Sequence, residues 1–415
     1  MALARNIFLH GGSSAAASIA LFALHVTAAR FLGAVDYGYY SFGLAFAAMF
    51  IPVFNLGMQS LTIREVARDR GTTSEYIAHA LIYKAIIAPL VFLVAIALLY
   101  FLQDSPRGFF VGSIMFLAMW IFSLHGALTP ALVAHERFDL NAMNTIIEKF
   151  GLLASVSLVC VLGFGLFGVA TAHLIWRVVG LVFLTWLVAR KIVKFRLALK
   201  PQFLRRMVFA AIPIGGVFIT SYIYNYLDTI MIGAMRSPEE VGWYSAAYRL
   251  YEGPMIFPAV VGTVLMPRIS RAYAERSSEL VKTTAIGFGL VIGAGVVCTL
   301  IWLAVAAPAI RVFYGEEFAN STPALTILAM GGTTVAFVNY FFQTTLISIN
   351  KQRMVLTSAV CGLIFNAALN LYLISRFGYI GAAWATVASA FFVLVVLTIV
   401  GAQAWREVRA VDFRV

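Results

Sequence analysis

The sequence predicts an all-α polytopic membrane protein with twelve transmembrane helices in two parallel-repeat six-helix lobes around a central cavity. The first observation behind this prediction is composition. Of the 415 residues, 62% are hydrophobic and only 12% are charged, and the mean hydropathy is +0.91. A soluble domain has about a quarter of its residues charged and could not bury this much apolar surface. The second observation is that the apolar sequence forms long runs, parts of which are repeated.

Twelve apolar runs are each long enough to cross a bilayer. A spanning helix needs about 20 apolar residues, and in hydrocarbon a run of that length satisfies its own backbone hydrogen bonds only as a helix. The first run is too long for a cleavable signal peptide and lacks a clear small-residue cleavage site. The predicted spans are Ile7–Ala29, Tyr39–Gln59, Ile77–Leu102, Gly108–Val133, Ala142–Leu162, Leu166–Leu187, Val208–Ala234, Gly242–Met266, Thr283–Val305, Ala324–Ile347, Met354–Ile374 and Gly381–Val400.

A short motif occurs twice in the chain, 204 residues apart. Gly38–Ser41 reads GYYS and Gly242–Ser245 reads GWYS, and each lies just after a break between apolar runs. A second, weaker repeat relates Gly168–Ala172 to Gly381–Ala385. Internal repeats of membrane segments are typical of transporters, with the substrate path at the interface between repeats. Six spans in each half is an even number, so both halves enter the membrane in the same sense and the repeats are predicted to be parallel.

The thirty basic residues are unevenly divided between the predicted loops. With both termini inside, inner loops and tails hold 21 of them, outer loops hold five and the spans hold four. Lysine and arginine in loops set orientation, so both termini are predicted to be cytoplasmic. The net charge of +12 is therefore explained by membrane orientation, and no nucleic acid partner is expected. The long inner connection, 191–207, interleaves basic and apolar residues, which predicts an amphipathic cytoplasmic hinge between an N-terminal lobe, 1–190, and a C-terminal lobe, 208–415.

No residue pattern indicates an enzyme, a cofactor or a metal site. The three cysteines lie inside apolar spans, and the six histidines are scattered without ligand spacing. Gly163–Gly168 matches a dinucleotide-binding glycine pattern, but it joins two spans and lacks the strand and helix that such a site needs. We therefore expect no catalytic residues, no cofactor and no bound metal.

Five segments of the chain form a recognisable set: Ala29–Gly33 (ARFLG), Tyr37–Ser41 (YGYYS), Asn55–Gly57 (NLG) with Arg64–Glu65, Asp228–Gly233 (DTIMIG) and Glu240–Tyr248 (EVGWYSAAY). Together they resemble the polysaccharide-repeat flippases of bacteria, which belong to the multidrug/oligosaccharidyl-lipid/polysaccharide exporter superfamily. The resemblance implies an inner-membrane protein with an alternating-access cavity between two six-helix lobes. It also implies a substrate carried on a polyprenyl diphosphate lipid, membrane lipids as partners, and a polysaccharide polymerase and other assembly proteins as candidate partners.

Seven charged residues lie within the predicted spans, where a charge is costly unless it faces a wet cavity or a partner. Arg177, Lys84 and Lys149 lie between the inner side and the middle of the first lobe, and we predict that they bind the diphosphate headgroup through charge-assisted hydrogen bonds. Internal ion pairing is the alternative, and Lys149 could also snorkel toward the inner face or pair with a neighbouring helix. Asp228, Arg249 and Glu252 lie in the outer half of the second lobe and are candidates for a coupling or interlobe charge. Arg249 could instead pair with Glu252 one turn along.

Two functions follow from this sequence. The first is a flippase that moves a polyprenyl-diphosphate-linked oligosaccharide from the inner to the outer face of the cytoplasmic membrane for exopolysaccharide, capsule or O-antigen assembly. The second is a cation-coupled multidrug antiporter of the same superfamily. A cavity for cationic drugs should carry an excess of acid, whereas the four intramembrane cations here outnumber the three acids. The charge balance therefore favours the flippase. A non-transporting membrane scaffold fits less well, since it would have little need of charges at the midplane.

Overall fold

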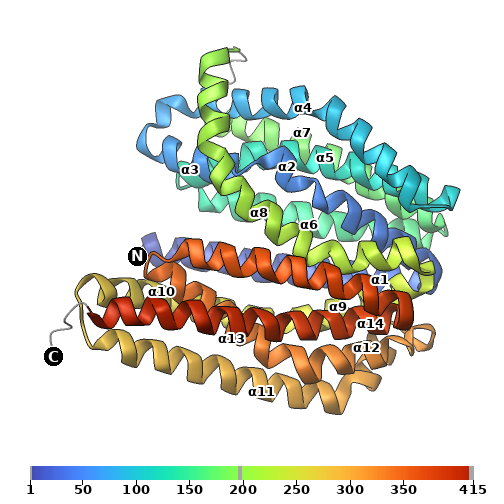
Figure 1. The fold of residues 1–415 in the computed structure, drawn as a ribbon. Helices are drawn as coiled ribbons and strands as arrows, with labels where there is room; N and C mark the ends of the chain where they lie inside the picture. Colours follow the sequence, from blue (N-terminus) through green and yellow to red (C-terminus); the bar gives the residue numbers. More distant parts are fainter. Residues whose placement is uncertain (1, 195–198, 411–415) are drawn as a thin grey trace. The chain divides into compact units, whose positions relative to one another are not determined.

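The computed structural model describes residues 2–194 and 199–410, and these residues form helices joined by short connections, with no strand among them. Two segments of the predicted organisation, 195–198 in the hinge and the last five residues, lie outside the described part. Figure 1 follows the helices in chain order. They are α1 (Ala2–Met49), α2 (Ile51–Asn55), α3 (Met58–Arg68), α4 (Thr73–Leu102), α5 (Pro106–Ala134), α6 (Phe138–Val161), α7 (Gly165–Lys191), α8 (Pro201–Met235), α9 (Pro238–Glu252), α10 (Ile256–Ala274), α11 (Glu279–Phe313), α12 (Ser321–Ile327), α13 (Thr333–Ser348) and α14 (Gln352–Ala410).

Among the described residues, nine helical stretches are long and apolar enough to cross a membrane, and ten if the bent pair 201–216 and 218–235 counts as one. Two of the nine, Gly11–Arg68 and Gln352–Ala402, contain 58 and 51 residues. A helix of that length would measure about 75–90 Å, well beyond the roughly 30 Å hydrocarbon core. Each is interrupted at a glycine with non-helical backbone angles, Gly33 and Gly378. If the bent pair counts as one span, dividing both stretches there would raise ten spans to the predicted twelve, and that count stays a prediction.

The chain forms two compact units, Met1–Ala234 and Met235–Val415. In the first unit, α1 packs along α5 and α6, and α7 packs along the same two helices. Close approach of α1 and α5 depends on paired glycines, because a Cβ on Gly43 would lie 3.3 Å from the Cα of Gly112. Helix α8 joins this unit through Met207 and Ala211, which pack with Met58 of α3. The two predicted lobes, divided at the hinge, were defined from the sequence repeat. The two compact units are defined by packing, so the division into lobes stays a prediction.

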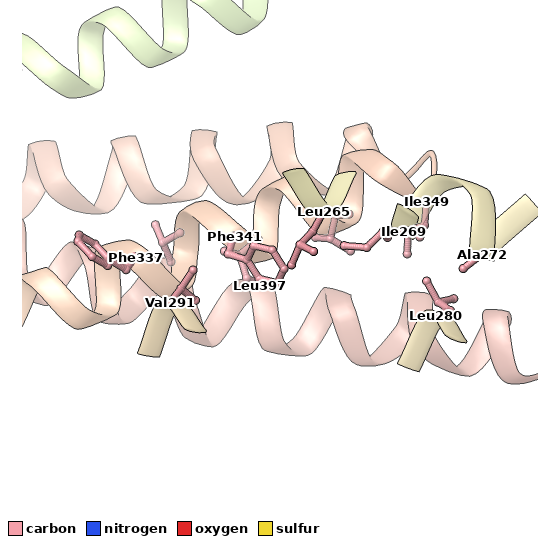
Figure 2. Close-up of a cluster of buried hydrophobic side chains, with 11 residues drawn as sticks. Leu265, Ile269, Ala272, Leu280, Val291, Phe337, Phe341, Ile349 and Leu397 are labelled. Carbon is pink, nitrogen blue, oxygen red and sulfur yellow. The ribbon is translucent and has the colours of Figure 1, made fainter. Parts of the chain in front are cut away.

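In the second unit, α10, α11, α13 and α14 enclose an apolar core. Figure 2 shows this cluster, which includes Phe337 and Phe341 of α13, Val291 of α11 and Leu397 of α14. Each of the four helices turns one apolar face toward this core, and together these faces bury the side chains of the cluster. In a bilayer, such packing and not hydrophobic exclusion holds the helices together, since lipid tails are as apolar as leucine.

The repeated motif makes an equivalent contact in each unit. Tyr40 in the first copy is buried, and its hydroxyl lies 2.9 Å from Nε2 of His173 on α7. Tyr244 in the second copy is also buried, and its hydroxyl lies 3.1 Å from Oγ1 of Thr386 on α14. His173 and Thr386 each come directly after the second repeated segment, GVATA or GAAWA. Corresponding residues of the two repeats therefore meet in the same way, as a duplicated architecture requires.

Candidate functional site

Two of the three predicted headgroup-binding cations lie together in the middle of the first unit. Glu148 and Lys149 are the eleventh and twelfth residues of α6, and Arg177 is the thirteenth of α7. The Arg177 guanidinium donates a hydrogen bond to Oε1 of Glu148. Nζ of Lys149 donates to the same oxygen over 3.1 Å. One carboxylate is thus shared by two cations, and we call Glu148, Lys149 and Arg177 the charged triad.

Aromatic and amide side chains from α5 and α6 surround the triad. The Arg177 guanidinium lies over the ring of Phe122, 4.1 Å from its centroid, and Nζ of Lys149 lies 5.2 Å from the same ring. His125, one turn along α5, stacks on Phe122 and has its Nε2 3.3 Å from Oδ1 of Asn144. The quadrupole of an aromatic ring stabilises a cation on its face. Phe122 therefore holds both cations where water is largely excluded.

The triad carries one more positive than negative charge. The exposed side-chain fractions are 6% for Arg177, 9% for Glu148 and 20% for Lys149. Nε of Arg177 is buried and has no hydrogen-bond partner among the described residues. A buried donor without a partner is costly, and so is an unbalanced charge. The arrangement can therefore accept an anion, and Lys149 is the member that such an anion would reach first.

Lys84 occupies a separate position in the same unit. Its Nζ donates to Oδ1 of Asn55 on α2 and, over 2.7 Å, to the carbonyl oxygen of Ser123 on α5. The side chain is 1% exposed and borders a crevice, lined also by Gln59 and Gly126, that is too narrow for a water molecule. These contacts fix the ammonium group but do not join it to the triad. Its assignment to the headgroup stays a prediction, as do those of Arg177 and Lys149.

The three charges predicted for coupling fall in different units. Asp228 lies on α8 in the first unit and is 6% exposed. Arg249 and Glu252 lie on α9 in the second unit, where Nη1 of Arg249 donates to Oε2 of Glu252 over 2.9 Å. Exposed side-chain fractions of 23% and 48% make this ion pair a weak one. A coupling or interlobe role for these three charges remains a prediction.

Sequence reasoning missed the residues that surround the triad. Phe122, His125 and Asn144 stand alone in the sequence and become neighbours only when α5 packs beside α6 and α7. From the sequence, the scattered histidines were also assigned no structural role. The structure links His173 with Tyr40, whose ring is tilted against that of Tyr37 with ring centroids 6.0 Å apart. The one sequence signal was spacing, because His173 precedes Arg177 by four residues and therefore lies one turn away on the same helix.

Comparison with known proteins gives matches along most of the chain. A family model described as polysaccharide biosynthesis protein matches residues 3–273, and the MatE model matches residues 213–372. A curated protein of Haloferax volcanii, described as "Probable low-salt glycan biosynthesis flippase Agl15", is 26% identical over 179 residues, which is 41% of this chain. The match spans 36% of that relative's length.

Two solved structures have a similar fold over nearly the whole chain. The lipid II flippase MurJ in an inward closed conformation has a TM-score of 0.78 and 14% identity, and the match covers 94% of this chain and 87% of that one. An inward-facing multidrug resistance MATE family transporter of the MOP superfamily has a TM-score of 0.79 and 14% identity, with 95% and 96% covered. Identity this low supports the fold alone. It confirms the predicted class, an all-α polytopic membrane protein.

Proposed function

Because this chain belongs to the polysaccharide biosynthesis protein family, whose model matches residues 3–273, we propose that it is a flippase for a polyprenyl-diphosphate-linked oligosaccharide. The substrate would move from the inner to the outer face of the cytoplasmic membrane by alternating access. It would serve exopolysaccharide, capsule or O-antigen assembly and pass to a polysaccharide polymerase. The description of Agl15 as a glycan biosynthesis flippase supports the same class of cargo.

The observation that carries this proposal is the surplus positive charge of the triad. A diphosphate must lose water as it enters the membrane, and charge-assisted hydrogen bonds from lysine and arginine replace that hydration. Lys149 and the unpartnered Nε of Arg177 are donors that Glu148 leaves available. A buried site of net positive charge favours an anionic headgroup and disfavours a cationic drug, because like charges repel most strongly where water is scarce.

The experiment measures flipping by the purified chain in liposomes. A polyprenyl-diphosphate-linked oligosaccharide is loaded into both leaflets, and a membrane-impermeant sugar oxidant reports the fraction that reaches the outer leaflet. Lys149→Gln should slow flipping by about tenfold or more, because a hydrogen bond to a charged group contributes about 1.5–3 kcal/mol. Lys191→Gln is the matched control, since Lys191 is exposed in the last turn of α7.

Three results would contradict the proposal. The wild-type chain could fail to move the lipid-linked sugar, or Lys149→Gln could flip as fast as Lys191→Gln. The third is ion-gradient-dependent efflux of a cationic dye from the same liposomes. The MatE match to residues 213–372 and the MATE structural likeness make the antiporter the second candidate, and dye efflux without flipping would establish it.

A further inference from the structure

The second unit contains an apolar pocket that the proposed flippase function does not use. Its volume is about 400 Å³, which is within the range of small-molecule sites. Helix α13 contributes Phe342, Thr345 and Leu346, and Ile349 follows it. Helix α14 contributes Thr398, Gly401 and Ala402. Positions three, four and seven apart share one face of a helix. Helix α11 contributes such a face, formed by Val281, Thr284, Ala285 and Phe288.

The pocket lies at the end of the unit where basic residues occur. It begins at the third residue of α11, Val281, and extends to Ile349, one residue beyond α13. Figure 2 shows Leu280 and Ile349 at the same end of the core cluster. Lys282 follows Val281 directly, and Arg353 lies four residues after Ile349; both are exposed. Neither forms an ion pair with a carboxylate of the described residues. Two cations therefore lie near this end of the pocket in sequence, together with the exposed Glu279 that begins α11.

One wall of the pocket holds an unused hydrogen-bond donor. Thr284 is 8% exposed, and its hydroxyl has no partner among the described residues. Thr345 on α13, which also lines the pocket, donates instead to the carbonyl oxygen of Phe341 over 2.9 Å. A buried hydroxyl normally finds an acceptor. Thr284 therefore indicates a ligand that brings an acceptor of its own into this largely apolar space.

These features select one class of ligand. Apolar lining alone cannot draw a lipid chain out of the bilayer, because the surrounding tails are equally apolar. Any preference of the pocket for one lipid over another must therefore come from the two basic residues and from the Thr284 hydroxyl. Phospholipids carry ester carbonyls just below a phosphate, whereas a polyprenyl chain has no acceptor below its phosphate. Thr284 is the sixth residue of α11, about 8 Å from the helix start, a depth that suits an ester.

We propose that this pocket binds an acyl chain of an anionic phospholipid, whose phosphate lies beside Lys282 and Arg353 and whose ester carbonyl accepts a hydrogen bond from Thr284. Basic residues at the membrane end of a helix bundle are a recurrent way of holding such headgroups. The bound lipid would fill the space between α11, α13 and α14. It would be a resident of the second unit and not the transported cargo.

Native mass spectrometry of the full chain in a neutral detergent tests this proposal. Phosphatidylglycerol and phosphatidylcholine of identical chains are added together, and phosphatidylglycerol should be retained preferentially. Ala285→Phe should abolish the preferred adduct, because the ring occupies the pocket. Ala304→Phe is the matched control: Ala304 is on the same helix, is exposed and does not line the pocket.

A second pair of variants tests the charge. Lys282→Gln should lower the preference for phosphatidylglycerol by about fivefold, equivalent to about 1 kcal/mol. Arg311→Gln, at the other end of α11, should leave it unchanged, since Arg311 pairs with Glu316. Thr284→Val removes the hydroxyl with little change in shape and should also reduce retention, which keeps the test decisive if Ala285→Phe fails to fold.

Three outcomes would overturn the assignment. Equal retention of the two phospholipids by the wild type would remove the role of charge. Full retention by both Ala285→Phe and Thr284→Val would place the lipid elsewhere. Displacement of phosphatidylglycerol by an equimolar polyprenyl phosphate would assign the pocket to the lipid carrier. Because the readout is binding and not transport, each outcome stands independently of the flippase proposal.

Discussion

Glu148 is the residue on which the charge balance of the first unit depends. It is the only carboxylate that contacts Lys149 and Arg177 among the described residues, and it lies with them at mid-helix. Burying two like charges side by side is unfavourable without a counter-charge, and the shared carboxylate supplies it. An arriving diphosphate would compete with Glu148 for both cations. The triad can therefore hold its cations in place before the substrate arrives and release them to it afterwards.

Neutralising Glu148 should destabilise the protein more than neutralising Lys149. Glu148→Gln leaves two cations without a counter-charge, and breaking such a buried pair costs about 3–5 kcal/mol. Lys149→Gln leaves a balanced Glu148–Arg177 pair and should have a much smaller effect. Thermal unfolding in detergent measures both. The double variant Glu148→Gln with Arg177→Gln should regain part of the loss, and a double variant less stable than Glu148→Gln would show that the triad is not the source of the effect.

The sequence predicts this site only in part, for a physical reason. Charges inside apolar runs are visible in any sequence, because their transfer cost makes them rare. Arg177 and Lys149 were identified in this way. The ring of Phe122 and the amide of Asn144 carry no such signal, since both residue types are ordinary in a membrane helix. Their role depends on which helix faces pack together, and the pattern of one chain does not determine that.

At the scale of elements, the interruption of α14 at Gly378 is held by side chains from the start of the second unit. Its backbone angles of φ 58° and ψ −143° are nearly confined to glycine. Oε2 of Glu240 accepts a hydrogen bond from the next amide, Tyr379 N, over 2.8 Å. Arg236 donates to the carbonyl oxygens of Ile374 and Ser375. Backbone groups freed by the break are thus satisfied, as the membrane environment demands.

Alanine at Gly378 should therefore be more damaging than alanine at another left-handed glycine. A Cβ there would approach Oε2 of Glu240 to within contact, whereas a Cβ on Gly163, with φ +74°, meets nothing within 4 Å. Gly163→Ala should cost about 1–2 kcal/mol from backbone strain alone. Gly378→Ala should cost clearly more, measured as the unfolding midpoint in detergent. Equal decreases in the unfolding midpoint of the two variants would mean that the Glu240 side chain moves away from the added Cβ without cost.

The break also shows why helix boundaries were harder to predict than helix existence. In the first repeat the corresponding glycine, Gly165, is the first residue of α7, directly after the turn that separates α7 from α6. In the second repeat, Gly378 interrupts one continuous helical stretch. Composition predicted an apolar run on each side of the glycine in both repeats. The backbone angles at the glycine decide whether the two runs form separate helices or one bent stretch, and these angles depend on contacts with Arg236 and Glu240.

At the scale of the whole molecule, the distribution of basic residues predicts a definite topology. It places the hinge between α7 and α8 inside and the turn between α8 and α9 outside. Helix α8 contains 35 residues, about 52 Å of helix even with its 45° bend, which is enough to connect the two faces. At the end of α8 that is predicted to lie inside, Nζ of Lys200 lies 2.9 Å from Oε1 of Glu75 on α4. The backbone amide of Lys200 also donates to Nε2 of His79 over 3.0 Å, so the residue before α8 contacts α4 through two polar interactions.

Single cysteines at the two ends of α8 test this topology. Leu199 and Ser237 are both exposed, so a difference in labelling would report the side of the membrane and not burial. The variants are Leu199→Cys and Ser237→Cys, each in a background without Cys160, Cys298 and Cys361. In intact cells, a membrane-impermeant thiol reagent should label the cysteine at 237 and spare the one at 199, and permeabilised cells should show both labelled. Labelling of both in intact cells would contradict the twelve-span topology, because α8 could not then cross the membrane once.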